Sequence, residues 1–236
     1  MISNCLNCDD ELIELMSWRG LFYREPQFLC YACDKQLVKI EGKRCLGCSR
    51  SLDDLAQQLI KGDVCLDCHR WEVDPEWKGI LHQNFSLYRY NDFLKEYLAK
   101  YKYRGDYVLA KAFSHTIKTY FTKVDYDLII PIPLSDERLY ERGFNQSTAL
   151  LEEAEVRPSN ILARSHSEKQ SKKTRSERLQ QEQVFQLVES VESDLNGKSV
   201  LLFDDIYTTG TTLRQAAKLL REAGAEEVSS LTLARG

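Results

Sequence analysis

Residues 201–213 read LLFDDIYTTGTTL, and this stretch decides the fold of the 236-residue chain. An apolar run ends in two adjacent acids, and threonines with one glycine follow before the next charge. Residues 199–203 have the character of a buried strand, and the apolar spacing over 211–223, followed by Gly224, predicts a helix. The stretch therefore contains a strand, a loop and the start of a helix.

The loop at 208–212 has the composition of a phosphate-binding site. Backbone N–H groups at a helix N-terminus lack intrahelical partners and lie at the positive end of the helix dipole. Gly210 permits close approach of a ligand, and four hydroxyls add donors: Thr208, Thr209, Thr211 and Thr212. The lysine of an ATPase P-loop is missing. The simpler alternative is a capped helix after a strand.

The two acids, Asp204 and Asp205, stand one step before this loop. Neighbouring carboxylates at a strand end can accept hydrogen bonds from adjacent sugar hydroxyls. A phosphate with a ribose beside it would therefore satisfy both halves of the stretch.

The rest of the carboxy-terminal half alternates between helical and strand patterns. Apolar positions predict helix on both sides of a polar break at 104–106. Further predictions are a strand at 127–132, a helix at 143–155 and a last strand at 227–233. Such alternation predicts an α/β fold, a parallel sheet flanked by helices, with ligands at the carboxyl ends of its strands.

All eight cysteines lie between residues 5 and 68, in four CxxC pairs: Cys5 and Cys8, Cys30 and Cys33, Cys45 and Cys48, Cys65 and Cys68. Two such pairs complete a tetrahedral zinc site, so the spacing predicts two structural Zn²⁺ ions in a double zinc ribbon. Sequential pairing of the knuckles is the simplest arrangement, and an interleaved pairing is the rival. Disulfides and a redox CxxC are the alternatives to zinc.

Composition places the chain among ordinary globular proteins, with 43% hydrophobic residues and a net charge of −4. The amino terminus does not resemble a secretory signal, and no window approaches the apolar length of a spanning helix. We therefore expect a cytoplasmic protein without membrane insertion, in which thiols stay reduced. The domains predicted are residues 1–72 for the ribbons, 73–84 for a linker and 85–236 for the α/β domain.

The opening stretch resembles the phosphoribosyl-pyrophosphate (PRPP) signature of type I phosphoribosyltransferases. Residues 128–147, LIIPIPLSDERLYERGFNQS, are similar to a segment of the ComF family (ComFC/GntX-like proteins), and KYRGD at 102–106 matches another segment. The four CxxC pairs ahead of this domain also fit that family. The resemblance implies a type I phosphoribosyltransferase-like domain and a late-competence factor for DNA uptake in natural transformation.

The resemblance also implies roles for individual residues. Asp204 and Asp205, the catalytic candidates, would bind the ribose hydroxyls, and Thr208–Thr212 would hold the 5′-phosphate. Pro131 and Ile132 would belong to the loop that meets pyrophosphate, with Mg²⁺ bridging pyrophosphate and ribose oxygens. For the prolines alone, a strand terminator is the simpler interpretation.

Basic residues would contact either pyrophosphate or DNA: Lys102, Arg104, Arg138, Arg142, Lys172, Lys173 and Arg175. Solvated helix charges are the alternative for Arg138 and Arg142. Residues 164–178 match the loop that closes over PRPP, although the glycine and leucine often found in that loop are replaced here. An ordinary solvated linker is the alternative for this loop.

Two functions follow from the resemblance. The first is a competence factor that binds single-stranded DNA and PRPP, is recruited to the uptake apparatus at the membrane, and works with a translocating ATPase or helicase. The second is an active phosphoribosyltransferase that transfers ribose 5-phosphate to an unidentified acceptor. A nucleobase-recognising hood is not identifiable in the sequence, which favours the first function over ordinary base salvage.

Overall fold

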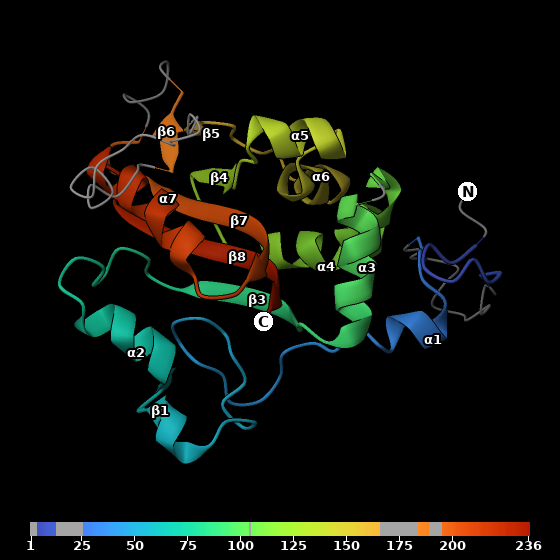
Figure 1. Ribbon diagram of the computed structural model, residues 1–236, viewed down its shortest axis with the longest axis horizontal. Helices are drawn as coiled ribbons and strands as arrows, with labels where there is room; N and C mark the ends of the chain where they lie inside the picture. Colours follow the sequence, from blue (N-terminus) through green and yellow to red (C-terminus); the bar gives the residue numbers. More distant parts are fainter. Residues whose placement is uncertain (1–3, 13–25, 104, 166–183, 189–194) are drawn as a thin grey trace, which may run out of the picture.

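The computed structural model describes residues 4–12, 26–103, 105–165, 184–188 and 195–236. Within these ranges, a cysteine-rich amino-terminal part lies against an α/β part whose sheet is at the centre of the molecule (Figure 1). None of the helices that the structure describes has the length and apolar character needed to span a membrane.

Parallel strands form the central sheet. In the described part of the chain the strand order is β3-β8-β7-β4, and each neighbouring pair is parallel. The strands are β3 (Asn84–Arg89), β4 (Leu128–Pro131), β7 (Ser199–Tyr207) and β8 (Glu227–Arg235). Because parallel strands all run in one direction, their carboxyl ends meet at one edge, where ligands bind in open α/β sheets.

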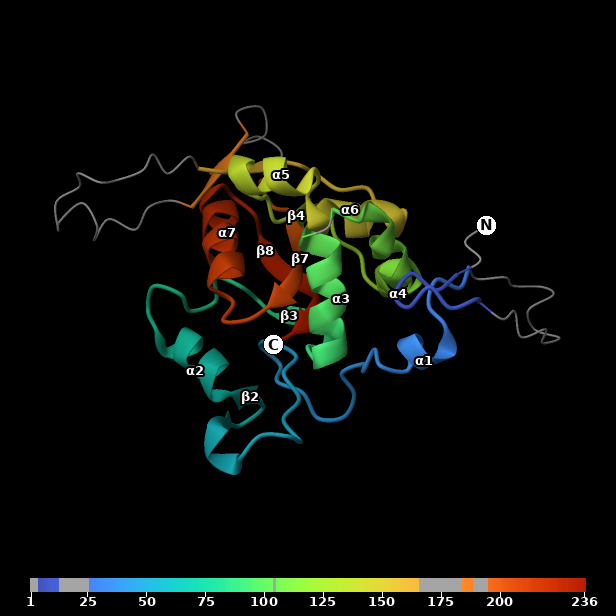
Figure 2. The ribbon, with the colours of Figure 1, turned by 45° about the vertical axis from the view of Figure 1, so that its right-hand side comes forward.

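Helices cover both faces of this sheet (Figures 1 and 2). One face is covered by α3 (Asp92–Tyr103), η2 (Tyr107–Ala110), α4 (Lys111–Phe121) and α6 (Gln146–Glu153), and the other by α7 (Thr211–Glu222). In α3 the buried residues follow helical spacing: Leu94, Tyr97, Leu98 and Tyr101. Burying one apolar stripe of each helix against the apolar strands produces the two cores of the domain.

Two parts of the predicted pattern need correction. The strand predicted to stop at residue 203 continues as β7 to Tyr207, so both acids lie inside the strand. The predicted helix over 143–155 begins at Gln146, because Gly143 adopts a left-handed φ of 76° and ends a separate helix, α5 (Asp136–Arg142). The Asn145 side chain accepts hydrogen bonds from two backbone N–H groups of α6 and fixes its start.

Short elements complete the described ranges. In the cysteine-rich part they are α1 (Tyr31–Asp34), η1 (Gln57–Leu59), β1 (Ile60–Lys61), β2 (Val64–Cys65) and α2 (Leu66–Val73). On the α7 side of the sheet, β5 (Leu162–Arg164) pairs with β6 (Phe185–Leu187) in an antiparallel arrangement.

The segment at 45–68 docks on the sheet through hydrogen bonds centred on Asn84, the first residue of β3. The Asn84 N–H donates to the Gly47 carbonyl at 3.0 Å, and the Ser49 hydroxyl donates to the Asn84 carbonyl at 2.8 Å. The buried Asn84 side chain also accepts a hydrogen bond from the Ser230 hydroxyl of β8 at 2.8 Å. These bonds satisfy polar groups that burial would otherwise leave unpaired.

Candidate functional site

The loop Thr208–Thr212, called the threonine loop below, joins the carboxyl end of β7 to the N-terminus of α7. Gly210 is the N-cap residue of α7 and has a φ of 82°, a conformation that favours glycine. The Thr209 and Thr211 hydroxyl oxygens lie 3.0 Å apart, and the four threonines are exposed. The loop therefore presents hydroxyls and helix-terminal N–H groups to solvent, which is the arrangement that binds phosphate.

A buried arginine lies directly beneath this loop. Arg214 of α7 is 2% exposed, and its guanidinium donates to the Tyr207 hydroxyl at 2.7 Å. A Cβ atom placed on Gly210 would overlap both that hydroxyl and the guanidinium. The threonine loop thus rests on a fixed positive charge. Sequence reasoning missed this charge, and the signal that could have found it is a single basic residue on the apolar face of α7.

The two acids of β7 have different neighbours. Consecutive strand residues point to opposite faces, so the two side chains diverge. Asp204 accepts a hydrogen bond from the Ser147 hydroxyl of α6 at 3.1 Å. Asp205 is buried and forms an ion pair with Lys102, at the end of α3.

The pKa of the Asp204 carboxyl group is strongly raised. Burial of the carboxyl, together with the negative charge of Asp205, raises the pKa of Asp204 to about 8. A carboxyl group with such a pKa changes its charge near neutral pH, which is a frequent property of functional sites.

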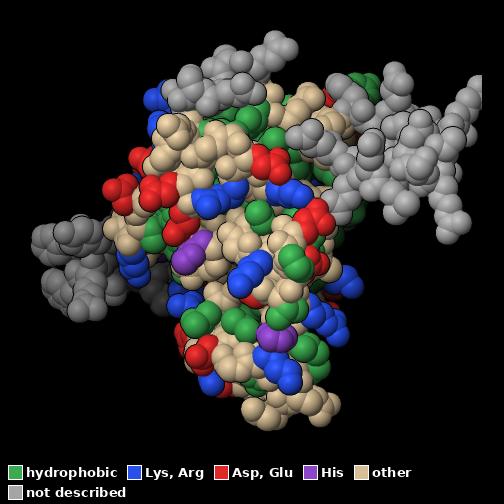
Figure 3. Space-filling view, turned by 90° about the vertical axis from the view of Figure 1, so that its left-hand side faces the viewer, with side chains coloured by type: hydrophobic (Ala, Val, Ile, Leu, Met, Phe, Trp, Pro, Cys, Tyr) green, Lys and Arg blue, Asp and Glu red, His purple; other side chains and the backbone are tan. Residues whose placement is uncertain are grey.

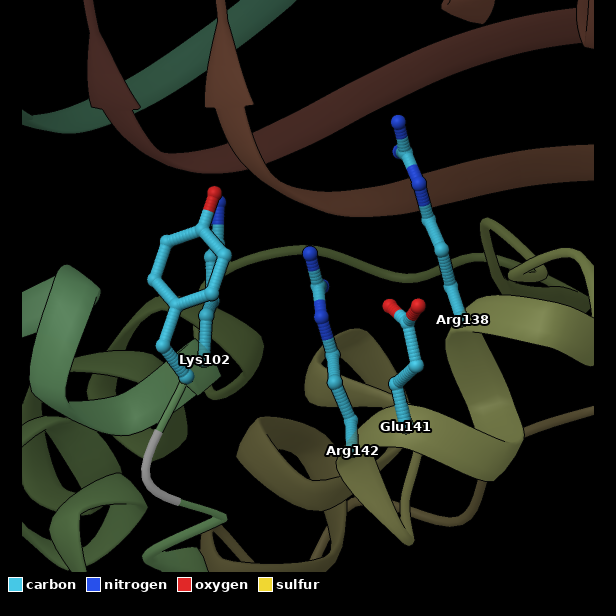
Figure 4. Close-up of a pocket in the computed structure, with 5 residues that line it drawn as sticks. Lys102, Arg138, Glu141 and Arg142 are labelled. Carbon is cyan, nitrogen blue, oxygen red and sulfur yellow. The ribbon is translucent and has the colours of Figure 1, made fainter.

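A hollow of about 470 Å³ opens at the end of α3, where Lys102 pairs with Asp205. It is lined by Lys102 and Tyr103 of α3 and by Arg138, Glu141 and Arg142 of α5, and is called the basic hollow below. Figure 4 shows the three α5 side chains rising in the same direction as Lys102. Arg142 donates to the Gln146 side chain at 2.9 Å, and its guanidinium lies over the Tyr103 ring at 5.9 Å. The fold thus brings three of the predicted basic residues together.

The other predicted site residues have separate positions. Pro131 ends β4, and the Ile132 N–H donates to the Phe203 carbonyl of β7 at 2.9 Å, so this segment is tied to the strand that carries the acids. The remaining predicted basic residues lie outside the described residues: Arg104, Lys172, Lys173 and Arg175. The predicted closing loop at 164–178 is also outside them, apart from its first two residues.

The cysteines form two four-sulfur groups within the described ranges. The first ribbon contains Cys5, Cys8, Cys30 and Cys33, and the second ribbon contains Cys45, Cys48, Cys65 and Cys68. This is the sequential pairing, and the thiols are unlinked by disulfides. In each group the sulfurs lie within 4.8 Å of one another, and Cys48 and Cys65 are 3.7 Å apart. Zn–S bonds of about 2.3 Å in a tetrahedron require similar separations, so both groups fit Zn²⁺.

The second ribbon has a hydrogen-bonding partner from the sheet. Arg235, at the end of β8, donates from Nε to the Cys48 sulfur at 3.3 Å and from a terminal nitrogen to the Tyr207 carbonyl at 3.3 Å. Hydrogen bonds from the neighbouring thiols lower the pKa of Cys48, and the charge of Arg235 lowers it further. A thiolate stabilised in this way is the form that binds zinc.

Comparison with known proteins identifies the family. A model described as a phosphoribosyl transferase domain matches residues 141–236. A competence protein ComFC of Bacillus subtilis is 42% identical over 237 residues, which cover 98% of this chain and 94% of that protein. The chain belongs to the ComFC family. A ComFC protein of Streptococcus pneumoniae is 32% identical, with 98% of this chain and 99% of that protein covered.

Among solved structures, an allosteric regulatory enzyme of purine biosynthesis is 21% identical over 52% of this chain and 25% of that chain, with a TM-score of 0.37. The family assignment, the phosphoribosyltransferase domain and the parallel sheet confirm the predicted fold class for this ComFC-family chain. The two Cys₄ groups are those expected of a double zinc ribbon. The domain boundaries and the roles of the site residues remain predictions.

Proposed function

We propose that this chain acts in DNA uptake during competence by binding PRPP at the threonine loop and single-stranded DNA at the basic hollow. The observation that carries the proposal is the meeting of three features at one edge of the sheet. These are the threonine loop over Arg214, the acids of β7 and the basic hollow. The competence role rests on membership in the ComFC family.

In the proposed PRPP complex, the threonine loop holds the 5′-phosphate with its N–H groups and hydroxyls. Asp204 accepts hydrogen bonds from a ribose hydroxyl, and Asp205 does so when Lys102 turns from it toward the pyrophosphate. Arg138 and Arg142 add two further cations on the pyrophosphate side. Mg²⁺ would bind to the substrate oxygens with most of its water retained.

The DNA contact is proposed for the same basic hollow and for the exposed ring beside it. Tyr103 is 81% exposed at the end of α3, next to Lys102 and below Arg142. An exposed aromatic ring among cations suits a single strand, whose bases stack while its phosphates contact the charges. By contrast, the face that carries α2 and α7 has interspersed positive and negative side chains (Figure 3). We therefore place the strand at the basic hollow.

Transfer of ribose 5-phosphate is the second candidate function, favoured by Lys102, which lines the basic hollow and pairs with Asp205 of β7. In that reaction the bond from ribose C1 to the pyrophosphate oxygen breaks, the leaving group keeps the electron pair, and an acceptor atom bonds to C1. Lys102, Arg138 and Arg142 would stabilise the departing pyrophosphate. The acceptor would approach C1 from the side of the ribose opposite the departing pyrophosphate.

We further propose a cytoplasmic location with recruitment to the uptake apparatus at the membrane. Transport of DNA needs an energy source, and this sequence carries no ATPase P-loop. The proposed partner is therefore a translocating ATPase or helicase.

The first experiment is fluorescence anisotropy of a labelled single-stranded oligonucleotide, titrated with zinc-loaded protein at several salt concentrations. We expect binding that weakens steeply with salt, by a logarithmic slope of about −0.7 for each phosphate contacted. Because the pyrophosphate of PRPP and the DNA share the cations of the basic hollow, adding PRPP and Mg²⁺ should weaken DNA binding, and this shift would support linkage of the two sites. Absence of binding at low salt would overturn the DNA proposal for the isolated chain, and pyrophosphate release with a panel of bases would then test the transferase.

A further inference from the structure

The second ribbon makes a direct contact with the threonine loop. Trp71 belongs to α2, the helix that begins directly after Cys65 and contains Cys68. Its indole Nε1–H donates to the Thr209 carbonyl at 3.1 Å. This bond joins residues that are 138 positions apart in the sequence. A side chain of the cysteine-rich part thus holds the backbone of the loop.

The same indole ring also covers the buried arginine beneath the loop. The guanidinium carbon of Arg214 lies 4.6 Å from the Trp71 ring, while a terminal nitrogen is bonded to Tyr207. The Nε atom of Arg214 has no hydrogen-bond partner within the described residues. Among the residues that the structure describes, no carboxylate pairs with this buried guanidinium; such burial is costly, and contact with an aromatic face offsets part of the cost. Trp71 therefore helps to keep this charge in place.

A second connection runs from the zinc ligands to the start of the loop. Arg235 donates hydrogen bonds to the Cys48 sulfur and to the Tyr207 carbonyl, and its guanidinium carbon lies 4.8 Å from the centre of the Tyr207 ring. Tyr207 is the last residue of β7 and directly precedes Thr208. The second ribbon is therefore linked to the loop segment at two points: directly through Trp71 at Thr209, and through Arg235 of β8 at Tyr207.

We propose that the second ribbon is a structural part of the phosphate site, with Trp71 as a positioning residue for the threonine loop. In this role, zinc at the second ribbon holds α2, α2 holds Trp71, and Trp71 fixes the Thr209 carbonyl and the Arg214 guanidinium. The amides of the loop are then oriented for phosphate before it arrives, which reduces the ordering cost of binding. The inference rests on the proposed binding of PRPP, because it names an element that shapes that site.

The first ribbon has a different neighbour. Lys100 of α3 donates to the Asn7 carbonyl and to its side-chain oxygen, at 3.2 and 2.9 Å. This contact is with the last turn of α3, which also carries Lys102, and not with the threonine loop. Loss of zinc from the second ribbon should therefore accelerate hydrogen exchange at the threonine loop, and loss of zinc from the first ribbon should not.

The test compares Trp71→Phe, which keeps an aromatic ring but lacks the N–H donor, with Trp71→Ala, which lacks both. Glu76→Gln is the matched control: Glu76 pairs with Lys218 of α7 at 2.7 Å, so this substitution removes the charge from another contact between the same parts of the molecule. Zinc content is measured for each variant, and all should retain two ions per chain.

Two readouts are used on the full-length, zinc-loaded protein. Hydrogen exchange without ligand should be faster at residues 208–214 in Trp71→Phe than in wild type, and unchanged in Glu76→Gln. Calorimetric titration with PRPP and Mg²⁺ should show affinity about 3- to 10-fold weaker for Trp71→Phe, the effect of one lost hydrogen bond. The loss should be larger for Trp71→Ala, and Glu76→Gln should match wild type.

The outcomes separate this inference from the proposed function. Unchanged exchange and unchanged PRPP affinity in both Trp71 variants would overturn the positioning role while leaving PRPP binding intact. If wild type binds no PRPP but exchange at the loop still accelerates in Trp71→Phe, the proposed function fails and the structural coupling stands. By linkage, saturating PRPP should also raise the affinity of the second ribbon for zinc, measured at equilibrium against a competing chelator, and an unchanged affinity would contradict the coupling.

Discussion

Lys102 and Asp205 form an ion pair between the last turn of α3 and the strand that leads into the threonine loop. The Lys102 side chain is 17% exposed and that of Asp205 is 7% exposed, so neither charge has full access to water. Removing one partner of such a pair leaves the other charge buried without compensation. The ion pair is therefore part of the proposed binding edge and also contributes to the stability of the fold.

Lys102→Met should lower the free energy of unfolding by about 3 kcal/mol, because it leaves the Asp205 carboxylate unpaired. Adding Asp205→Asn should restore more than half of this loss, as a double-mutant cycle by urea unfolding would show. Lys118→Met is the control, since Lys118 pairs with Glu155 at an exposed site and its loss should cost less than about 1 kcal/mol. Equal losses for the two lysine variants would contradict a special role for the buried pair.

Asp204→Asn should raise stability at alkaline pH. The pKa of Asp204 is raised to about 8 in the folded protein, so the native state holds a proton that the unfolded chain releases near pH 4. Wild type therefore loses stability as pH rises from about 4 to about 8, and the variant does not. Since Asp204 is partly exposed, we expect the free energy of unfolding of Asp204→Asn to exceed that of wild type by only roughly 1–2 kcal/mol at pH 8.5 and by almost nothing at pH 4. Thermal or urea unfolding at the two pH values measures this difference.

Asp127→Asn is an opposite-sign control for this pH dependence. The backbone N–H and hydroxyl of Ser199 lower the pKa of Asp127 by hydrogen bonding to its carboxylate. Its stabilising effect is present above the ordinary Asp pKa and is lost as pH falls through the lowered value. The variant should therefore be less stable than wild type at neutral pH and converge with it in acid, the reverse of Asp204→Asn.

Gly210→Ala should destabilise the threonine loop through overlap as well as backbone strain. The new Cβ would meet the Tyr207 hydroxyl and the Arg214 guanidinium, which are both buried. We expect a loss of about 2–4 kcal/mol in unfolding free energy together with loss of PRPP binding. Gly62→Ala, at φ 62° with no atom within 4 Å of the added Cβ, should show strain alone at about 1 kcal/mol. Similar losses at the two positions would argue against crowding at Gly210.

Arg138→Ala and Arg142→Ala should each weaken binding of single-stranded DNA and reduce its salt dependence. Each removes a cation of the basic hollow, so the logarithmic slope should become shallower by about 0.7 per variant. Lys123→Ala is the control, because this exposed lysine precedes β4 and therefore lies near the amino edge of the sheet. If the logarithmic salt slope became equally shallow in Lys123→Ala, the DNA would have to bind elsewhere.

Cys30→Ser and Cys65→Ser should each reduce zinc content from two ions to about one per chain, because the ligands form two separate groups. Mass spectrometry under native conditions measures the zinc content of each variant. Loss of both ions in either variant would contradict independent sites. The second ribbon is buried against the sheet, so Cys65→Ser should also lower thermal stability more than Cys30→Ser.

The sequence predicts those features that depend on local spacing. Four CxxC pairs indicate two zinc sites, and the alternation of strand and helix patterns around 201–213 indicates a parallel sheet with a loop at its carboxyl edge. The pairing of the CxxC knuckles stays open between a sequential and an interleaved arrangement, because spacing alone does not say which loops meet in space. Helix α5 is short and has no buried side chain, so it carries no apolar stripe that a periodicity argument could detect.

Long-range partners are what the sequence does not predict. Nothing in the segment around Trp71 indicates a hydrogen bond to Thr209, and the place of Arg214 on the apolar face of α7 suggests burial without showing that the residue lies beneath the loop. The end of β7 was also misplaced, because polar residues usually mark the end of a buried strand. Here Lys102 and Ser147 provide partners for the two acids and allow the strand to continue.

The hydrogen bonds between Asn84 and the segment at 45–68 have a consequence for how this chain can change during evolution. They join a cysteine-rich part and a sheet through matched donors and acceptors, which tolerate substitution less well than apolar contacts of similar size. A ribbon exchanged between distant relatives would need two side chains to be present together: Ser49, whose hydroxyl donates to the Asn84 carbonyl, and Asn84, whose amide donates to the Cys48 carbonyl at 3.4 Å. We therefore expect the ribbons and the sheet to be inherited as one unit, with correlated changes across their boundary in alignments of the family.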